Sequence, residues 1–240
     1  MKIIFFDTET TGNTGKDYLC QLAIKELGKD EPIINALYKP PVPIPIECTM
    51  IHNISNKTVA DRPAFQDAPE YSELKELFES EDVLPIAHNA AFDVQMLKNE
   101  SIIVPRYICT LKVIQALDTA GEFAMYKLQY LRYALDMDID VPAHDALADV
   151  LVLEKLFAYE LNRMTSDWHM DEAQALKEMV KISTQPMTFR HLTFGKYKGK
   201  TIEEVLIVDR GYLEWLLSQK KQSDVDETDW IHTLEKYLSL

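Results

Sequence analysis

The sequence predicts an α/β fold, with a mixed five-stranded sheet flanked by helices and a small C-terminal module. Three strand-like segments open the chain and alternating helix and strand patterns follow them, which is typical of a sheet covered by helices. The composition changes after Arg163, where a polar stretch precedes residues 187–240. A chain of 240 residues can hold one full core and a smaller appendage.

The first strand is predicted at residues 3–6, a continuous apolar run that suits a central strand buried on both faces. Two further strands are expected over 17–27 and 32–39, because a Gly-Lys-Asp turn at 28–30 separates two strand-like patterns. The prolines between residues 40 and 45 exclude a helix there and favour extended chain.

Helices and two short strands are expected in the rest of the first part. Residues 83–87 and 107–110 are the predicted strands. The spacing of apolar residues predicts helices over 71–80, 91–99, 111–119, 127–135 and 146–163. Residues 165–185 are polar with a helical middle, and Pro186 ends that stretch. We therefore expect a helical linker over 166–186 between a domain at 1–165 and a module at 187–240.

The net charge and the lengths of the apolar runs limit which kinds of partner the protein could bind. The net charge of −14 argues against general electrostatic attraction to nucleic acid. It does not exclude a nuclease, because bound metal ions cancel charge locally and a protein that grips a strand end needs few phosphate contacts. No apolar run could span a bilayer, and the N-terminus does not read as a signal peptide, so we expect a cytoplasmic protein without membrane contact.

The three cysteines, Cys20, Cys48 and Cys109, are odd in number and widely spaced. They match neither a disulfide framework nor a zinc site, so reduced thiols are expected.

Carboxylates concentrate in three short stretches, residues 7–12, 88–93 and 144–149. Asp7 and Glu9 are two apart at the end of a predicted strand, so they point the same way. Carboxylates that are buried together cost free energy unless a cation neutralises them, and oxygen ligands suit Mg²⁺ or Mn²⁺. The alternative for an isolated Asp-x-Glu is a strand end with solvated acids.

Two further acids lie in line with apolar helix faces. Asp93 precedes Met96 and Leu97 at helical spacing, and Asp149 stands in the same relation to the apolar residues of its own helix. The alternative for each acid is a cap or a buried hydrogen bond. We expect Asn89 to cap the helix that begins near residue 91, and Asp145 to be a cap or first-turn acid of the next.

His144 lies five residues before Asp149. Five helical steps would leave the two about 140° apart, so His144 must stand on the loop before the helix to share a site with Asp149. A histidine takes a proton near neutral pH, which suits a catalytic base, although an isolated histidine is more often a surface residue.

Together the three stretches resemble the motifs of the DEDDh branch of the DnaQ-like 3′→5′ exonucleases, which have an RNase H-like fold. The likeness covers roughly residues 1–165 and includes the order and spacing of the motifs. It implies that His144 is the general base. The metal ligands that it implies are Asp7, Glu9, Asp93 and Asp149.

The implied activity is hydrolysis of phosphodiester bonds from the 3′ end of DNA by two-metal catalysis. The expected cofactors are two Mg²⁺ or Mn²⁺ ions, which Asp7 bridges, and the expected products are 5′-mononucleotides. The substrate would be DNA with a single-stranded or frayed 3′ end, in repair or proofreading, with no particular polymerase or repair partner indicated. The expected substrate contacts are Thr8, Thr10, Asn89 and Phe92, with the backbone N–H groups around Thr8 and Thr10 free to meet the terminal nucleotide.

One stretch departs from the family pattern. Many relatives carry His-Gly-Ile-Thr where this chain has His52-Asn53-Ile54-Ser55. Asn tolerates left-handed backbone nearly as well as Gly, so we expect the turn to persist and His52 to be structural.

Residues 192–201 and 212–217 resemble the C-terminal module of exodeoxyribonuclease X-like proteins. A strand through Lys196, Lys198 and Lys200 would place three cations on one face, as candidate contacts to nucleic acid. Tyr197, Tyr212 or Trp215 could stack on bases. The alternative is a satellite fold with these aromatic residues in its own core and solvated lysines.

Other functions share parts of this sequence pattern. RNA 3′-end trimming would use the same chemistry, because only contacts to the 2′-hydroxyl separate the two substrates. A non-catalytic nucleic-acid or protein-binding module would be favoured by loss of an acid or of His144, and all five residues are present. Haloacid dehalogenase-type enzymes also begin with strand-Asp-x-acid, but the stretches 89–93 and 144–149 have no place in that scheme.

Overall fold

The computed structural model describes residues 1–137, 139, 145–223 and 227–239. The chain forms two compact units, Met1–Ser183 and Thr184–Leu240. Each unit has a hydrophobic core of its own.

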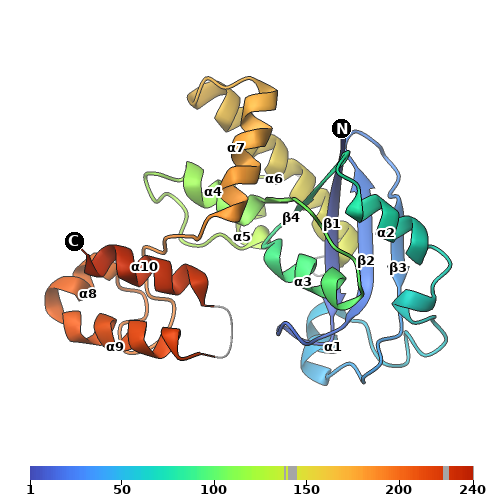
Figure 1. Ribbon diagram of the computed structural model, residues 1–240, viewed down its shortest axis with the longest axis horizontal. Helices are drawn as coiled ribbons and strands as arrows, with labels where there is room; N and C mark the ends of the chain where they lie inside the picture. The colour runs from blue at the N-terminus through green and yellow to red at the C-terminus, as the bar shows by residue number, and fades with distance from the viewer. Residues whose placement is uncertain (138, 140–144, 224–226, 240) are drawn as a thin grey trace. The chain divides into compact units, whose positions relative to one another are not determined.

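A mixed sheet in the order β3-β2-β1-β4-β5 organises the first unit (Figure 1). The pairs β1–β2 and β2–β3 are antiparallel, whereas β1–β4 and β4–β5 are parallel. The predicted mixed five-stranded sheet is thus confirmed. Its strands are β1 Lys2–Thr10, β2 Leu19–Glu26, β3 Ile34–Leu37, β4 Val83–Ala87 and β5 Ile108–Cys109.

The helices of the first unit follow the predicted pattern with one addition. Their bounds are α1 Ile46–His52, α2 Tyr71–Glu79, α3 Ala91–Asn99, α4 Thr110–Leu117, α5 Leu128–Ala134, α6 Ala146–Asp167 and α7 Glu172–Thr184. A single 3₁₀ turn at Phe65–Asp67 precedes α2. Helix α1 was not predicted. It begins directly after Pro45, where a fixed φ suits the entry to a helix, so the proline run precedes this helix rather than replacing it.

Alternation along β1 divides the core into two layers. Phe6 and its even-numbered neighbours pack in a cluster that includes Leu74 and Phe78 of α2 and Leu97 of α3. Phe5 packs on the other face with residues of α4, α6 and α7. Helix α6 lies against both β1 and β2, so its first turn is held beside the end of β1.

Helix α7 lies within the stretch that was expected to be a linker. Ala175, Leu176 and Met179 of this helix share a buried cluster with Phe157 of α6. The Cys109 N–H also donates to Ser183 Oγ at 2.7 Å. The first unit therefore extends through α7 to Ser183.

The second unit is a small helical fold. Helices α8 Ile202–Val208, α9 Arg210–Lys221 and α10 Thr228–Leu238 surround a core that includes Leu192, Leu213 and Leu234. The strand predicted through Lys196, Lys198 and Lys200 is wrong, because residues 195–200 form turns. Gly195 and Gly199 cause this difference, since their φ values of 72° and 87° are left-handed.

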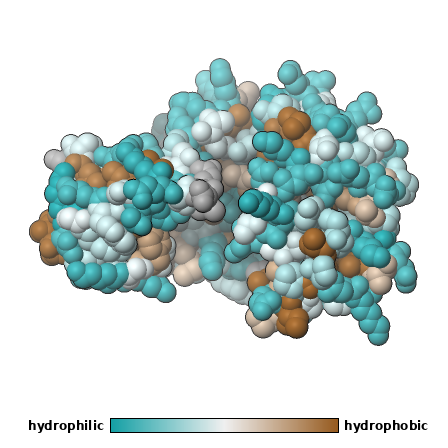
Figure 2. All heavy atoms as spheres, turned by 60° about the horizontal axis from the view of Figure 1, so that its bottom comes forward, coloured by the Kyte–Doolittle hydropathy of each residue, from teal (hydrophilic) through white to brown (hydrophobic). Residues whose placement is uncertain are grey.

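No described helix is both long and apolar enough to cross a membrane. On the face drawn in Figure 2, hydrophilic residues predominate and hydrophobic residues form small, separate patches.

Glu160 on α6 is an unusual core residue. Its side chain is 0% exposed, and neither carboxyl oxygen has a hydrogen-bond partner in the described part of the chain. Burial raises the pKa of Glu160 well above its ordinary value, although the backbone of Ile114 acts in the opposite direction. The folded protein therefore keeps this carboxyl protonated to a higher pH than the unfolded chain, where it ionises near its ordinary pKa of 4.5.

We predict that Glu160→Met stabilises the protein, by about 1–3 kcal/mol at about pH 8, because it removes an unsatisfied buried polar group. A folded pKa above the unfolded value costs stability as pH rises past the unfolded pKa, so the gain should be smaller at about pH 5. Urea unfolding at the two pH values measures both effects.

Glu154 on the same helix provides the matched control. It pairs with Lys25 Nζ at 2.6 Å, so Glu154→Met should destabilise the protein instead. A lower free energy of unfolding for Glu160→Met at the higher pH would show that the Glu160 carboxyl makes a stabilising contact in the folded protein.

Candidate metal centre

Strand β1 turns Asp7 and Glu9 toward one site. Their register partners on β2 are Ala23 and Gln21. Both acids are partly exposed, whereas Thr8 between them is buried on the opposite face. The alternation of the strand alone therefore brings two carboxylates together at its end.

Asp149 enters the same site from the first turn of α6. Asp145 caps this helix, as expected, since its carboxylate accepts from the Ala148 N–H at 3.1 Å. One carboxylate oxygen each of Asp7, Glu9 and Asp149 lies within 4.8 Å of the others. We call these three residues the acid cluster.

Asp93 approaches from α3, on the other face of the sheet. Its Oδ1 accepts from the Thr8 N–H at 3.1 Å and from the Thr8 hydroxyl at 2.6 Å, and Asp93 is 3% exposed. It lies outside the three-oxygen acid cluster, but its charge raises the pKa of Asp7 and of Glu9. The Thr8 N–H is consequently not free for substrate, which corrects the expectation from the sequence.

The electrostatics of this site favour a cation. Burial, followed by the charges of Asp149, Asp93 and Asp145, raises the pKa of Glu9 to about 8. Burial raises the pKa of Asp93 to about 7 against the two hydrogen bonds from Thr8, and the pKa of Asp7 also lies well above its ordinary value. Because the neighbouring charges that act on Glu9 are all acidic, the oxygen donors fit a hard divalent cation such as Mg²⁺ or Mn²⁺.

Two glutamines donate hydrogen bonds to acids at this site. Neither was expected from the sequence. Gln129 Nε2 of α5 donates to Asp149 Oδ1 at 2.5 Å, and Gln129 Oε1 accepts from Arg132 at 3.3 Å. Gln21 lies opposite Glu9 and contacts Asp145 Oδ2 at 3.4 Å. A polar residue within the apolar run of β2 was a signal for Gln21, whereas nothing in the helical pattern distinguished Gln129.

His52 is structural, as expected. Its ring is buried, and Nδ1 accepts from the Ile54 N–H at 3.0 Å. The neutral ring therefore carries its proton on Nε2, which donates to the Thr10 carbonyl at 3.2 Å. Asn53 has a left-handed φ of 61°, so the expected turn is present.

His88 anchors the start of the second motif. Its Nε2 donates to the Tyr126 carbonyl at 2.7 Å, and its Nδ1 lies 2.9 Å from the Thr110 hydroxyl. Burial lowers the pKa of His88 to about 4, so the ring is neutral near pH 7.

Asn89 is not the helix cap that the sequence predicted. The N-cap of α3 is Ala90, without a side-chain hydrogen bond, and Asn89 adopts a left-handed φ of 61°. Its side chain is exposed, and Phe92 is half-buried one turn before Met96. Both remain expected substrate contacts. Thr10 is buried, and its hydroxyl donates to the Gly12 carbonyl at 2.5 Å.

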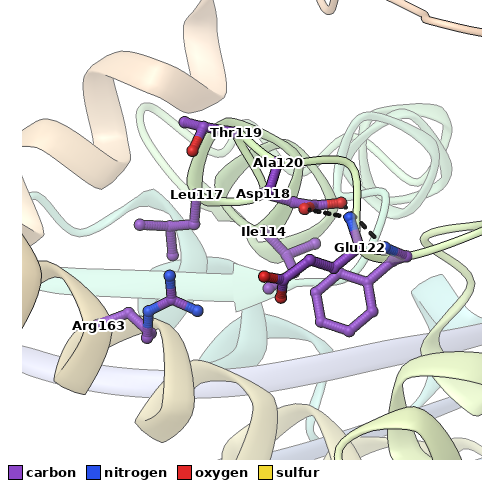
Figure 3. Close-up of a pocket in the computed structure, with 8 residues that line it drawn as sticks. Ile114, Leu117, Asp118, Thr119, Ala120, Glu122 and Arg163 are labelled. Atoms are coloured by element: carbon purple, nitrogen blue, oxygen red, sulfur yellow. Dashed lines mark hydrogen bonds between the residues drawn. The ribbon is translucent and has the colours of Figure 1, made fainter.

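A separate small pocket lies at the C-terminal end of α4 (Figure 3). Asp118 accepts from the N–H groups of Glu122 and Phe123, at 2.7 and 3.1 Å, and from the Tyr126 hydroxyl at 2.9 Å. The pocket includes none of the acid cluster. Asp118 thus stabilises the conformation of the loop that contains Tyr126, whose carbonyl accepts the hydrogen bond from His88.

His144 lies outside the described residues, since 140–144 are not among them. In the sequence it directly precedes Asp145, the cap of α6. Its assignment as general base stays a prediction.

Comparison with known proteins adds independent findings. The model of the exonuclease family matches residues 4–157, and that of the exodeoxyribonuclease X-like C-terminal family matches residues 192–221. Exodeoxyribonuclease 10 of Escherichia coli (strain K12) is 30% identical over 217 residues, which cover 88% of this chain and 89% of that protein.

Solved structures show the same fold. Exonuclease X in complex with 5′-overhanging duplex DNA is 25% identical with a TM-score of 0.56, covering 75% of this chain and 99% of the other. The zinc-bound E. coli ExoI–ssDNA complex is 18% identical with a TM-score of 0.56, covering 74% and 43%. The latter likeness supports the fold alone. The RNase H-like sheet architecture expected from the motifs is confirmed.

We predict that Gln129→Ala weakens binding of Mn²⁺ about 10–100-fold, because a hydrogen bond that orients a ligand is lost. Calorimetric titration of the metal-free protein measures the affinity. Gln95→Ala is the control, because Gln95 bonds Asn99 at 2.8 Å and not an acid of the cluster. Equal affinities for the wild type and Gln129→Ala would show that Asp149 needs no such support.

We predict that removal of divalent cations makes stability fall as pH rises. The ordinary pKa values are 4.5 for Glu9 and 3.8 for Asp93, and the fold raises them to about 8 and about 7. Between these limits the folded state binds more protons than the unfolded state, so the free energy of unfolding decreases with pH. The Tm in EDTA should therefore be lower at about pH 8 than at about pH 5, and Mg²⁺ should restore it at the higher pH.

Glu9→Gln should reduce that slope, since it removes one of the groups that take up a proton. A Tm in EDTA that is independent of pH would contradict the assignment of raised pKa values to this site.

Proposed function

Because this chain belongs to the exonuclease family, we propose that it hydrolyses DNA from the 3′ end and releases 5′-mononucleotides with two divalent cations. The observation that carries this proposal is the acid cluster. Its oxygens lie within 4.8 Å of one another, and the charged neighbours that act on Glu9 are all acidic. Such an arrangement is costly without a bound cation.

The choice of DNA rests on the relatives. The 30% identical protein is named an exodeoxyribonuclease, and the 25% identical structure contains duplex DNA with a 5′ overhang. A duplex with a 5′ overhang has a recessed 3′ end. By this likeness we assign the chain a substrate with a free 3′ end, and a role in repair or proofreading.

Asp7, Glu9, Asp93 and Asp149 would together hold the two cations. Bound Mg²⁺ or Mn²⁺ would supply Lewis acidity, which makes water more acidic and stabilises the charge that develops on the leaving 3′-oxygen. Thr8 orients Asp93 and Gln129 orients Asp149 through the hydrogen bonds described above. These contacts fix the ligands before substrate arrives.

His144 would remove a proton from the attacking water. This role follows from its place directly before Asp145 in the sequence and from the resemblance of the third motif. His88 and His52 do not compete for it, since hydrogen bonds to backbone carbonyls occupy their Nε2 protons.

The decisive experiment resolves the products of 5′-labelled, 3′-tailed DNA and matched RNA by length, with Mg²⁺, Mn²⁺ or EDTA. We expect a ladder that shortens from the 3′ end of DNA, mononucleotide products and no reaction in EDTA. Degradation from the 5′ end would overturn the polarity, and a faster reaction on RNA would reassign the substrate.

Two variants test the roles within the same assay. Asp7→Asn should lose metal-dependent turnover almost entirely. His144→Ala should lower kcat about 10²–10⁴-fold with little change in KM, because a general base acts in the transition state. Full turnover by His144→Ala at neutral pH would remove the base assignment.

A further inference from the structure

The second unit contains a basic segment in an acidic protein. Residues 184–202 contain no Asp or Glu, although the whole chain carries a net charge of −14. The same stretch contains Arg190, Lys196, Lys198 and Lys200. This segment, rather than the whole C-terminal unit, thus offers a polyanion a local concentration of positive charge, although Glu203 and Glu204 follow it directly.

Tight turns present these lysines to solvent. The Leu192 N–H donates to the Lys200 carbonyl at 2.9 Å and the Gly199 N–H to the Leu192 carbonyl at 2.6 Å, which closes the loop. Lys198 and Lys200 are exposed, and neither forms an ion pair with another described residue. They are therefore available to phosphate groups.

A row of aromatic rings, which we call the aromatic ladder, continues from this loop onto α9. It consists of Tyr197, Tyr212 and Trp215, with centroids 5.1 Å apart in the first pair and 5.6 Å in the second. Lys196 Nζ lies 4.7 Å from the centre of the Tyr197 ring. Positive charge and π surface thus adjoin directly.

Asp209 holds the ladder in place. Its Oδ2 accepts from the Tyr197 hydroxyl at 2.7 Å and from Lys196 Nζ at 3.0 Å, and its Oδ1 accepts from the Tyr212 N–H at 3.1 Å. A Cβ at Gly195 would overlap the Tyr212 hydroxyl, so the glycine lets the loop lie against this ring. The rings are therefore ordered in advance, which lowers the entropy cost of binding.

The two ends of the ladder differ in burial. Tyr197 and Tyr212 pack partly against the core of the second unit, whereas Trp215 is 55% exposed and is not part of that core. An exposed indole beside ordered tyrosines and lysines is the arrangement by which proteins stack the bases of a single strand. The cations favour this ligand over a protein partner.

We propose that the aromatic ladder and the lysines at 196, 198 and 200 form a second binding site, for single-stranded nucleic acid, apart from the acid cluster. A base stacks on Trp215, and Lys198 and Lys200 contact phosphates. The proposal rests on the proposed function only for the identity of the polymer as DNA. A second site on the same chain would raise the local concentration of substrate at the first.

The test measures binding of the full-length protein to labelled oligo(dT) by fluorescence anisotropy in EDTA, where the acid cluster has no metal to attract DNA. We expect Trp215→Ala to weaken binding about tenfold or more. Trp168→Ala is the matched control, because Trp168 is a 37% exposed tryptophan of the first unit, and it should bind as the wild type does. Trp215 is exposed, so its replacement should leave the Tm unchanged.

Salt dependence tests the lysines. Replacement of Lys198 and Lys200 by Ala should reduce the slope of log K against log salt by about 1.4, the counterion release of two phosphate contacts to a single strand. The control carries the same charge change at two exposed lysines of the first unit, Lys29 and Lys57, and should keep the wild-type slope.

The outcomes separate the two proposals. Equal affinities of wild type and Trp215→Ala would overturn the second site, and would leave the ladder as a surface for a protein partner or as part of a satellite fold. Hydrolysis by the wild type with Mg²⁺ is read separately, so a protein that binds through Trp215 but does not cleave would refute only the proposed function.

Discussion

Mutual repulsion among carboxylates at the end of β1 is the constraint on which the rest of the first unit depends. Asp7, Glu9 and Asp149 converge within 4.8 Å, and burial adds to their repulsion, so the fold must hold them there at a cost. Much of the surrounding structure supplies that restraint. The Asp145 cap fixes where α6 begins, and the partly buried Lys25–Glu154 pair joins β2 to the same helix.

The two faces of the sheet also explain why Asp149 and Asp93 reach the site from different helices. Odd-numbered residues of β1 face α6, so Asp149 meets Asp7 and Glu9 directly. Asp93 stands on α3 across the sheet, and the backbone and hydroxyl of Thr8 hold it at the strand end. Thr8 thereby links the two faces. Because successive side chains of a strand point to opposite faces, a strand that alternates acids with a threonine can contact residues from helices on both sides of the sheet.

The sequence was sufficient for elements with a strong local signal. Apolar runs and helical spacing predicted the five strands, and they placed α3 at the residues where it lies. Local patterns could not reveal contacts between distant segments, such as Gln129 with Asp149 or Thr8 with Asp93. The strand expected through Lys196, Lys198 and Lys200 is absent because Gly195 and Gly199 adopt left-handed φ values, which the alternation of lysines along the sequence does not reveal.

The packing of α7 determines where the chain can be truncated without exposing the core of the first unit. The family match ends at residue 157, yet Ala175 and Met179 lie in the same buried cluster as Phe5 and Phe157. A polypeptide truncated after the third motif would leave that layer of the sheet open to water and uncovered. The smallest fragment that keeps its hydrophobic interior therefore runs to Ser183.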